Sequence, residues 1–239
     1  MGNKQTKQGS NRSLHALQDN LVASNMSLGK DYDISESLGT KGGIKKAQKR
    51  FTKTQQSTGG VAIKLFNGQS RSNTNLKREA KILGLCDHPN IVKLFEITKV
   101  GNQMSLVLEL CDGGSVLDRL PYKEAQAAKI VKQVCSAVSY MHGKNIVHRD
   151  IECSNIMFST TKEDSEVKLV DFGSACELAT VPNHPGAFKF LKEKTGSLTS
   201  MAPEVIRGKY GPKADSWSIG VLAFTLLNNG GGPFKGSTK

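Results

Sequence analysis

The hydrophobic pattern of the chain changes at Gly113-Gly114 from strand-like to helix-like. After the two glycines, residues 123–142 carry apolar side chains at the spacing of an amphipathic helix. Before them, β-type runs surround one helical stretch: 60–65, 91–97 and 105–110, with the helix at 75–85. A strand-rich part followed by a helix-rich part predicts an α+β chain with two lobes. The glycines make 111–115 a plausible hinge.

The beginning of the chain differs from the rest in composition. Residues 1–31 are rich in Asn, Gln, Ser and Lys, which predicts a flexible arm. The opening Met1-Gly2-Asn3-Lys4-Gln5-Thr6 fits the N-myristoylation pattern, with Gly2 as the acylated residue. One myristoyl chain binds membranes only marginally, so the basic residues nearby are candidates for a second, electrostatic contribution. We expect a cytoplasmic protein that associates with membranes through Gly2; the alternative is a plain disordered tail.

Composition excludes several other classes of protein. The longest apolar run is far too short for a bilayer span, which takes about 20 residues. The five cysteines show neither Cys-x-x-Cys spacing nor Cys/His pairing, which indicates free thiols and no zinc site. The net charge of +12 is spread along the chain, and its local clusters lie outside any recognisable nucleic-acid module. We therefore expect a solvated basic face and no nucleic acid partner.

Separate short motifs supply the groups that phosphoryl transfer needs. This chemistry requires a cation on the phosphates, oxygen ligands for Mg²⁺ and a carboxylate that orients the attacking hydroxyl. The series is Val61-Ala62-Ile63-Lys64, Glu79, His148-Arg149-Asp150, Asn155, Asp171-Phe172-Gly173, Ala202-Pro203-Glu204 and Asp215-Ser216-Trp217-Ser218. Each motif alone is more often a turn or a surface loop, but the complete ordered set is very hard to obtain by chance.

In this order the motifs resemble the signature set of protein kinases, and the resemblance runs from Tyr32 to the end of the chain. The segments 88–94 and 202–221 are most similar to calcium/calmodulin-dependent and calcium-dependent protein kinases. The resemblance implies a β-rich N-lobe with one helix at 32–111 and a helical C-lobe at 112–239. The sequence stops soon after Phe234, so the last helices of the family's C-lobe are absent from it.

The resemblance implies a role for each motif. Lys64 would hold the α- and β-phosphates of ATP and pair with Glu79, although a surface lysine and an ordinary helix carboxylate are the plain alternative. Asp150 would accept or orient the proton of the substrate hydroxyl. Asn155 and Asp171 would bind Mg²⁺. The other implied ATP contacts are Leu38, Gly39, Gly42, Gly43, Ile44, Ala62, Leu108, Glu109, Cys111 and Met157. The implied regulatory stack of apolar side chains is Leu83, Leu94, His148 and Phe172, which would otherwise be plain core residues.

The loop between Gly173 and Ala202 resembles a kinase activation loop. Its candidate phosphorylation sites are Thr195, Ser197, Thr199 and Ser200. Arg149 could pair with a phosphorylated side chain there and order the loop. Gly196-Ser197 resembles the Gly-Thr pair of serine/threonine kinases, which favours serine and threonine substrates over tyrosine.

Three positions depart from the family pattern. The glycine loop at 38–44 is about two residues short of that pattern, which puts its hold on ATP in doubt. Glu152 stands where serine/threonine kinases carry a lysine on the transferring phosphate, and losing one such contact typically costs about 10²–10³ in rate. Ser154 replaces an acid that often recognises basic residues in substrates, so a preference for basic substrates cannot be assumed.

The predicted helix at 214–228 is apolar nearly all round, like a helix buried on every side. Without covering helices, part of it would face water, and Glu204 would lack the arginine partner that the family places further along the chain. We therefore expect a marginally stable chain with an exposed apolar patch.

The sequence predicts a serine/threonine protein kinase that transfers the γ-phosphate of Mg-ATP to protein hydroxyls. The alternative is a pseudokinase, an ATP-binding or scaffolding module with little phosphotransfer, which Glu152 and the short glycine loop favour. Retention of Lys64, Asp150 and Asp171, with their partners Glu79 and Asn155, favours the enzyme. A third possibility is that the chain is a piece of a longer protein.

Overall fold

The computed structural model describes residues 22–27, 32–38, 43–49, 60–66, 70–100, 103–182, 184 and 186–234. The chain divides into two compact units. The N-unit comprises Met1–Gly84 with Lys93–Leu110, and the C-unit comprises Leu85–Val92 with Cys111–Lys239. Within the described ranges, no helix has both the length and the apolar character that a membrane span needs.

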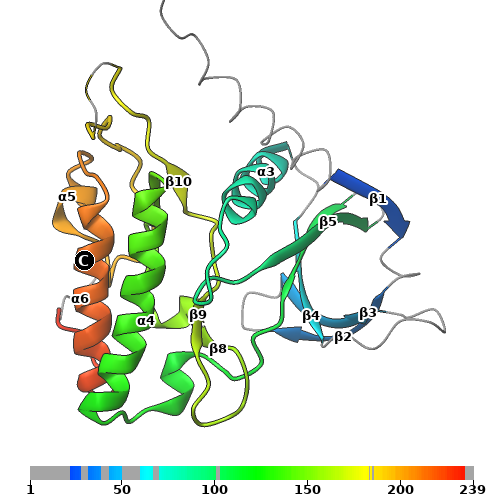
Figure 1. The fold of residues 1–239 in the computed structure, drawn as a ribbon, viewed down its shortest axis with the longest axis horizontal. Coiled ribbons are helices and arrows are strands. Elements are labelled where there is room, and N and C mark those ends of the chain that lie inside the picture. Colours follow the sequence, from blue (N-terminus) through cyan, green and yellow to red (C-terminus); the bar gives the residue numbers. More distant parts are fainter. Residues whose placement is uncertain are drawn as a thin grey trace, which may run out of the picture. The chain divides into compact units, whose positions relative to one another are not determined.

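The N-unit is built on a six-stranded sheet with the order β1-β5-β6-β4-β3-β2 (Figure 1). Its strands are β1 (Val22–Ser27), β2 (Tyr32–Leu38), β3 (Ile44–Lys49), β4 (Val61–Leu65), β5 (Leu94–Val100) and β6 (Gln103–Glu109). All neighbours pair antiparallel except β1 and β5, which run parallel. Because Ala62 and Lys64 alternate along β4 with the core residues Val61 and Ile63, they lie on the opposite face of the sheet from that core.

Strand β1 departs from the prediction of a flexible arm at 1–31. Residues 22–27 pair with β5 at the edge of the sheet. An edge strand can be held by main-chain hydrogen bonds that any sequence supplies, so polar composition did not signal this one.

Helix α3 (Ser70–Gly84) contacts β5 and β6 and is longer than the predicted stretch at 75–85. Leu76, Glu79, Ala80 and Leu83 recur at three- and four-residue intervals, and all four are buried. The predicted stretch therefore covers the part of the helix in which these buried side chains recur.

Helices are the longest elements of the C-unit, which also has two small two-stranded sheets, β8-β9 and β10-β7 (Figure 1). Its elements are η1 (Val116–Arg119), α4 (Glu124–Gly143), β7 (Ile146–Val147), η2 (Cys153–Asn155), β8 (Ile156–Phe158), β9 (Val167–Leu169), β10 (Cys176–Glu177), α5 (Pro203–Ile206) and α6 (Lys213–Leu227). The predicted helix at 123–142 agrees closely with α4, whose apolar stripe from Ala127 to Met141 is buried.

Helix α6 has a buried side and an exposed side. Ala214, Ser218 and Leu222 are buried. Phe224 and Leu227 are 45% and 57% exposed, although both are large apolar side chains. The apolar side chains of α6 therefore have two environments, one inside the C-unit and one at its surface, which the sequence alone does not distinguish.

Asp215 on α6 holds the loop that follows β7. Its carboxylate is fully buried and accepts hydrogen bonds from the backbone N–H of His148 (3.0 Å) and of Arg149 (2.8 Å). The Nε2 atom of His142 on α4 lies 2.8 Å from the same carboxylate. One side chain thus ties α4, α6 and the loop together. Burial lowers the pKa of His148, which keeps its ring neutral inside this arrangement.

Asp215→Ala should lower the free energy of unfolding of the chain by about 3 kcal/mol. Two buried N–H groups would lose their acceptor, and each unsatisfied group costs about 1–3 kcal/mol. Urea unfolding followed by circular dichroism measures the change, with Glu163→Ala in the exposed turn after β8 as the control. A stability equal to that of the control would contradict the anchoring role of Asp215.

Candidate active site

In the N-unit, β4 and α3 bring Lys64 and Glu79 together. Lys64 Nζ lies 2.8 Å and 3.0 Å from the two carboxylate oxygens of Glu79. Glu79 is 1% exposed. A carboxylate this deeply buried needs a cation or hydrogen-bond donors, and Lys64 supplies both. The pair is therefore a built feature of the unit and not a chance contact between surface side chains.

The strand register gathers the other predicted nucleotide contacts of the N-unit. Ile44 on β3 is opposite Lys64, and Ala62 is opposite Leu108 on β6. Glu109 ends β6, and its backbone N–H donates to the carbonyl of Lys93. These positions depend only on antiparallel pairing, which places cross-strand neighbours about 5 Å apart. Their contacts with ATP remain predictions.

The predicted glycine loop connects β2 and β3. Leu38 pairs with Ile44 across the hairpin, and the carbonyl of Gly43 accepts a hydrogen bond from the N–H of Leu65 at 2.7 Å. Gly39 and Gly42 lie outside the described residues, as does Gly2.

In the C-unit, the loop around η2 positions Asp150 and Asn155. Asn155 Nδ2 donates to the backbone carbonyl of Asp150 (2.9 Å) and to its Oδ2 atom (3.2 Å). The backbone N–H of Ser197 donates to Oδ1 of Asp150 at 3.0 Å. Two hydrogen bonds from different segments thus fix the orientation of one partly exposed carboxylate.

The pKa of Asp150 is raised above its usual value. Burial is the main cause, and the negative charges of Glu152 and Asp171 add to it, while the hydrogen bond from Ser197 opposes it. A raised pKa makes a carboxylate a better proton acceptor. The environment of Asp150 therefore suits a group that takes or orients the proton of a hydroxyl.

The predicted magnesium ligands present oxygen atoms suited to that ion. The amide nitrogen of Asn155 is engaged by Asp150, so its oxygen is the atom available to a cation. Asp171 Oδ1 accepts from the N–H of Gly173 at 3.0 Å, which orients this carboxylate. The described residues contain no group of three or more His, Cys, Asp or Glu arranged to hold a metal. A carboxylate and an amide fit Mg²⁺ that completes its coordination with water and phosphate oxygens.

The four residues of the predicted apolar stack fall into both units. Leu83 is buried in the N-unit, and Leu94 begins β5 there. In the C-unit, the rings of His148 and Phe172 meet edge to face, with centroids 5.0 Å apart. Both rings are fully buried. The two rings therefore pack together within the C-unit.

Comparison with known proteins identifies the family. The protein kinase domain matches residues 32–239. The chain belongs to the protein kinase family. This match confirms the predicted α+β protein kinase fold. The relatives described next confirm the resemblance to calcium-dependent and calcium/calmodulin-dependent protein kinases.

Two relatives show where in the family this kinase domain lies. It is 37% identical over 228 residues to calcium-dependent protein kinase 5 of Plasmodium falciparum (isolate 3D7), covering 92% of this chain and 38% of that protein. It is 39% identical over 157 residues to human calcium/calmodulin-dependent protein kinase type IV, covering 64% of this chain and 32% of that protein. The chain thus spans well under half the length of either relative.

The activation loop of this kinase domain is held by an ion pair between Arg149 and Glu193, and the sequence analysis did not predict the part of Glu193. Arg149 was predicted to bind a phosphorylated side chain. In the structure its Nη1 atom lies 3.0 Å from the carboxylate of Glu193 and 3.3 Å from the hydroxyl of Tyr210. Its Nε atom donates to the carbonyl of Ser174 at 2.6 Å. The arginine that was predicted to bind a phosphorylated side chain is therefore already paired with a carboxylate.

The four predicted phosphorylation sites differ in their surroundings. Ser200 is 5% exposed, which disfavours its modification by another enzyme in this conformation. Ser197 and Thr199 contact each other through their hydroxyls at 3.1 Å. The hydroxyl of Thr195 lies 3.1 Å from that of Ser174. Phosphorylation at Thr195, Ser197 or Thr199 remains a prediction.

Gly196 is required for the activation loop to approach the backbone of Arg149, next to Asp150. Its φ of +101° lies in the left-handed region, and an added Cβ would fall 2.2 Å from the carbonyl oxygen of Arg149. No L-residue with a side chain fits there. This close approach is what brings the N–H of the next residue, Ser197, to Asp150.

Glu193→Gln should loosen the activation loop around residues 192–196, because a neutral amide binds the Arg149 guanidinium more weakly than a carboxylate does. Hydrogen–deuterium exchange of peptides covering this segment measures the effect, and faster exchange is expected. Glu163→Gln, the same change in an exposed turn, is the control. Unchanged exchange in Glu193→Gln would show that the loop does not depend on this ion pair.

Proposed function

We propose that this chain is a serine/threonine protein kinase that transfers the γ-phosphate of ATP to protein hydroxyls. The observation that carries the proposal is the geometry of Asp150, whose two carboxylate oxygens accept hydrogen bonds from Ser197 and Asn155. Such a carboxylate can orient a substrate hydroxyl and take its proton. The family match and the kinase names of the relatives support the same assignment.

We propose nucleotide binding by the residues that the protein kinase family match implies. Lys64, held by Glu79, would neutralise the α- and β-phosphates. Asn155 and Asp171 would hold Mg²⁺, which when bound neutralises negative charge on the phosphates. Ala62, Ile44 and Met157 would contact the adenine, with hydrogen bonds to the backbone at Glu109 and Cys111. The preference for serine and threonine is proposed from Gly196-Ser197.

The pseudokinase alternative rests on Glu152 and the short glycine loop. Neither feature removes a group that holds the metal or orients the nucleophile. Lys64 retains its carboxylate partner, and Asp150 retains its two donors. The favoured proposal is therefore an enzyme whose rate is reduced by the departures, not a module without turnover.

Asp150→Asn should reduce transfer of labelled γ-phosphate from Mg-ATP to a serine/threonine peptide library by about 10²–10⁴-fold. The amide cannot accept the proton of the hydroxyl, and general-base assistance typically contributes this much. Glu163→Gln should transfer phosphate at the rate of the unmodified chain. Circular dichroism establishes that each variant is folded. No transfer from the folded unmodified chain would favour the pseudokinase.

We also propose that Gly2 is myristoylated and that the acyl chain contributes to membrane association. The proposal is supported by the sequence Met1-Gly2-Asn3-Lys4-Gln5-Thr6. Co-expression with an N-myristoyltransferase should add one myristoyl group to the chain and none to Gly2→Ala, as measured by mass spectrometry. Only the acylated chain should sediment with anionic vesicles. An unacylated chain under these conditions would contradict the proposal.

A further inference from the structure

Exposed cations gather on one surface of the C-unit, formed by residues 188–194 and 206–209 and here called the basic strip. The strip contains five basic side chains and one acid, Glu193. The basic side chains are all exposed: Lys189, Lys192, Lys194, Arg207 and Lys209. Glu193 does not offset them, because its carboxylate lies 3.0 Å from Nη1 of Arg149 and is paired with that guanidinium. The strip therefore presents positive charge to solvent.

Backbone pairing joins the two stretches of the strip. The N–H of Leu191 donates to the carbonyl of Tyr210 at 2.8 Å, and the N–H of Tyr210 donates to the carbonyl of Leu191 at 3.1 Å. Both side chains pack with Ala202 and Val205 in one apolar cluster. Because side chains alternate along an extended stretch, the residues on either side of Leu191 and Tyr210 point to solvent. The positive surface is thus built by the fold and is not a loose tail.

An aromatic ring lies among these cations. Phe190 is 53% exposed, and Lys209 Nζ lies 5.0 Å from the centre of its ring. The ring of Phe188 meets that of Phe190 edge to face, with centroids 5.7 Å apart. Phe188 packs on Gly211, where an added Cβ would fall 2.5 Å from the Phe188 ring. A packed neighbour thus supports Phe190 at the surface. Ile206 adds a second apolar side chain that is 51% exposed.

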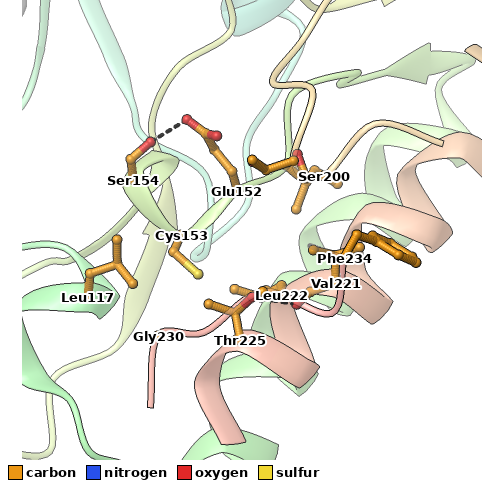
Figure 2. Close-up of a pocket in the computed structure, with 13 residues that line it drawn as sticks. Leu117, Glu152, Cys153, Ser154, Ser200, Val221, Leu222, Thr225, Gly230 and Phe234 are labelled. Atoms are coloured by element: carbon orange, nitrogen blue, oxygen red, sulfur yellow. Dashed lines mark hydrogen bonds between the residues drawn. The ribbon is translucent and has the colours of Figure 1, made fainter. Parts of the chain in front are cut away.

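The strip is separate from the pocket of the C-unit that Figure 2 shows. That pocket has a volume of about 310 Å³ and lies beside η2, and the charged side chain among its described lining residues is Glu152. A carboxylate there disfavours anions. The cations of the strip instead stand on long flexible stems at the surface. This arrangement suits an extended anionic partner better than a small anion.

An anionic membrane fits the strip better than an acidic protein does. An acidic protein would need carboxylates at fixed positions opposite the separate cations, whereas lipid headgroups can move to the cations that approach them. The membrane interface also accommodates the exposed ring. Phe190 would enter the boundary between headgroups and acyl chains, while the lysine ammonium groups stay in water beside the phosphates. Charge and apolar surface therefore point to the same partner.

We propose that the basic strip docks the C-unit on an anionic phospholipid surface. The inference extends the proposed acylation of Gly2, because one myristoyl chain binds membranes only marginally and stable association takes a second signal. Basic residues near Gly2 were the candidates for that signal in the sequence. The strip is a candidate that belongs to the folded C-unit. Its contacts with lipid do not themselves require Gly2, so the two proposals can be tested separately.

The first measurement uses the acylated chain and two kinds of vesicle, phosphatidylcholine alone and two parts phosphatidylcholine to one part phosphatidylserine. Sedimentation gives the partition coefficient for each kind, and the ratio of the two is the preference for anionic lipid. The preference is compared in Lys189→Gln with Lys192→Gln, in Phe190→Ser, and in a matched control. The control is Lys132→Gln with Lys162→Gln, which removes two exposed lysines outside the strip. Circular dichroism establishes that each variant is folded.

The double variant of the strip should lose most of the preference for anionic lipid. A cation near an anionic surface strengthens binding about fivefold, so removing two should lower the preference by about 25-fold. The control loses the same charge and should keep its preference, because screening weakens charges that do not face the lipid. Phe190→Ser should weaken binding to the mixed vesicles severalfold. An equal preference in the two double variants would overturn the inference while leaving the acylation of Gly2 standing.

The second measurement needs no acylation. In Gly2→Ala with Phe190→Trp, the emission of the new tryptophan reports the surroundings of position 190, and Gly2→Ala alone gives the background from Trp217. A large excess of mixed vesicles at low salt should shift the emission to shorter wavelength, although this chain binds too weakly to sediment. Polyglutamate, the probe for an acidic protein, should leave the emission unshifted. An unshifted emission with vesicles, or a shift with polyglutamate alone, would overturn the lipid assignment.

Discussion

The loop that carries Asp150 depends on hydrogen bonds that the carboxylate of Asp215 accepts. This carboxylate binds two successive backbone N–H groups, those of His148 and Arg149. Arg149 has a φ of 68°, a left-handed conformation that costs a residue with a side chain roughly 1–2 kcal/mol. The buried hydrogen bonds to Asp215 offset this cost. The resulting turn sends the Arg149 side chain to Glu193 and leaves Asp150 facing the N–H of Ser197.

Negative charge accumulates around this turn. Glu152 and Asp171 both raise the pKa of Asp150, because a nearby negative charge disfavours the ionised form of that carboxyl. Cations are the natural way to relieve that repulsion. Asp171 has ligand chemistry suited to Mg²⁺. On this reading the negative charge is matched to the proposed metal and its nucleotide.

Local patterns predicted the parts of the site that lie on regular elements. Lys64 and Glu79 could be paired in advance because a strand and a buried helix face have fixed periodicities. Strand β1 could not be predicted, because its pairing at the sheet edge relies on backbone groups that every sequence has. Glu193 was also missed. It is an exposed acid in an irregular loop, and only the positions of Gly196 and Tyr210 bring it to Arg149. Long-range contacts of that kind leave no periodic trace in a sequence.

The Glu193 contact changes what phosphorylation of the activation loop would do. A phosphate adds about −1.5 to −2 charge at neutral pH. Arg149 is already paired with Glu193, so a new phosphate would have to displace that carboxylate. Ser197 presents a further conflict, because its own N–H binds Asp150 at 3.0 Å. A phosphate on Ser197 would place two anions side by side and raise the pKa of Asp150 further. In this structure Glu193 and Gly196, which are built into the chain, hold the loop, and added charge at Ser197 would oppose its contact with Asp150.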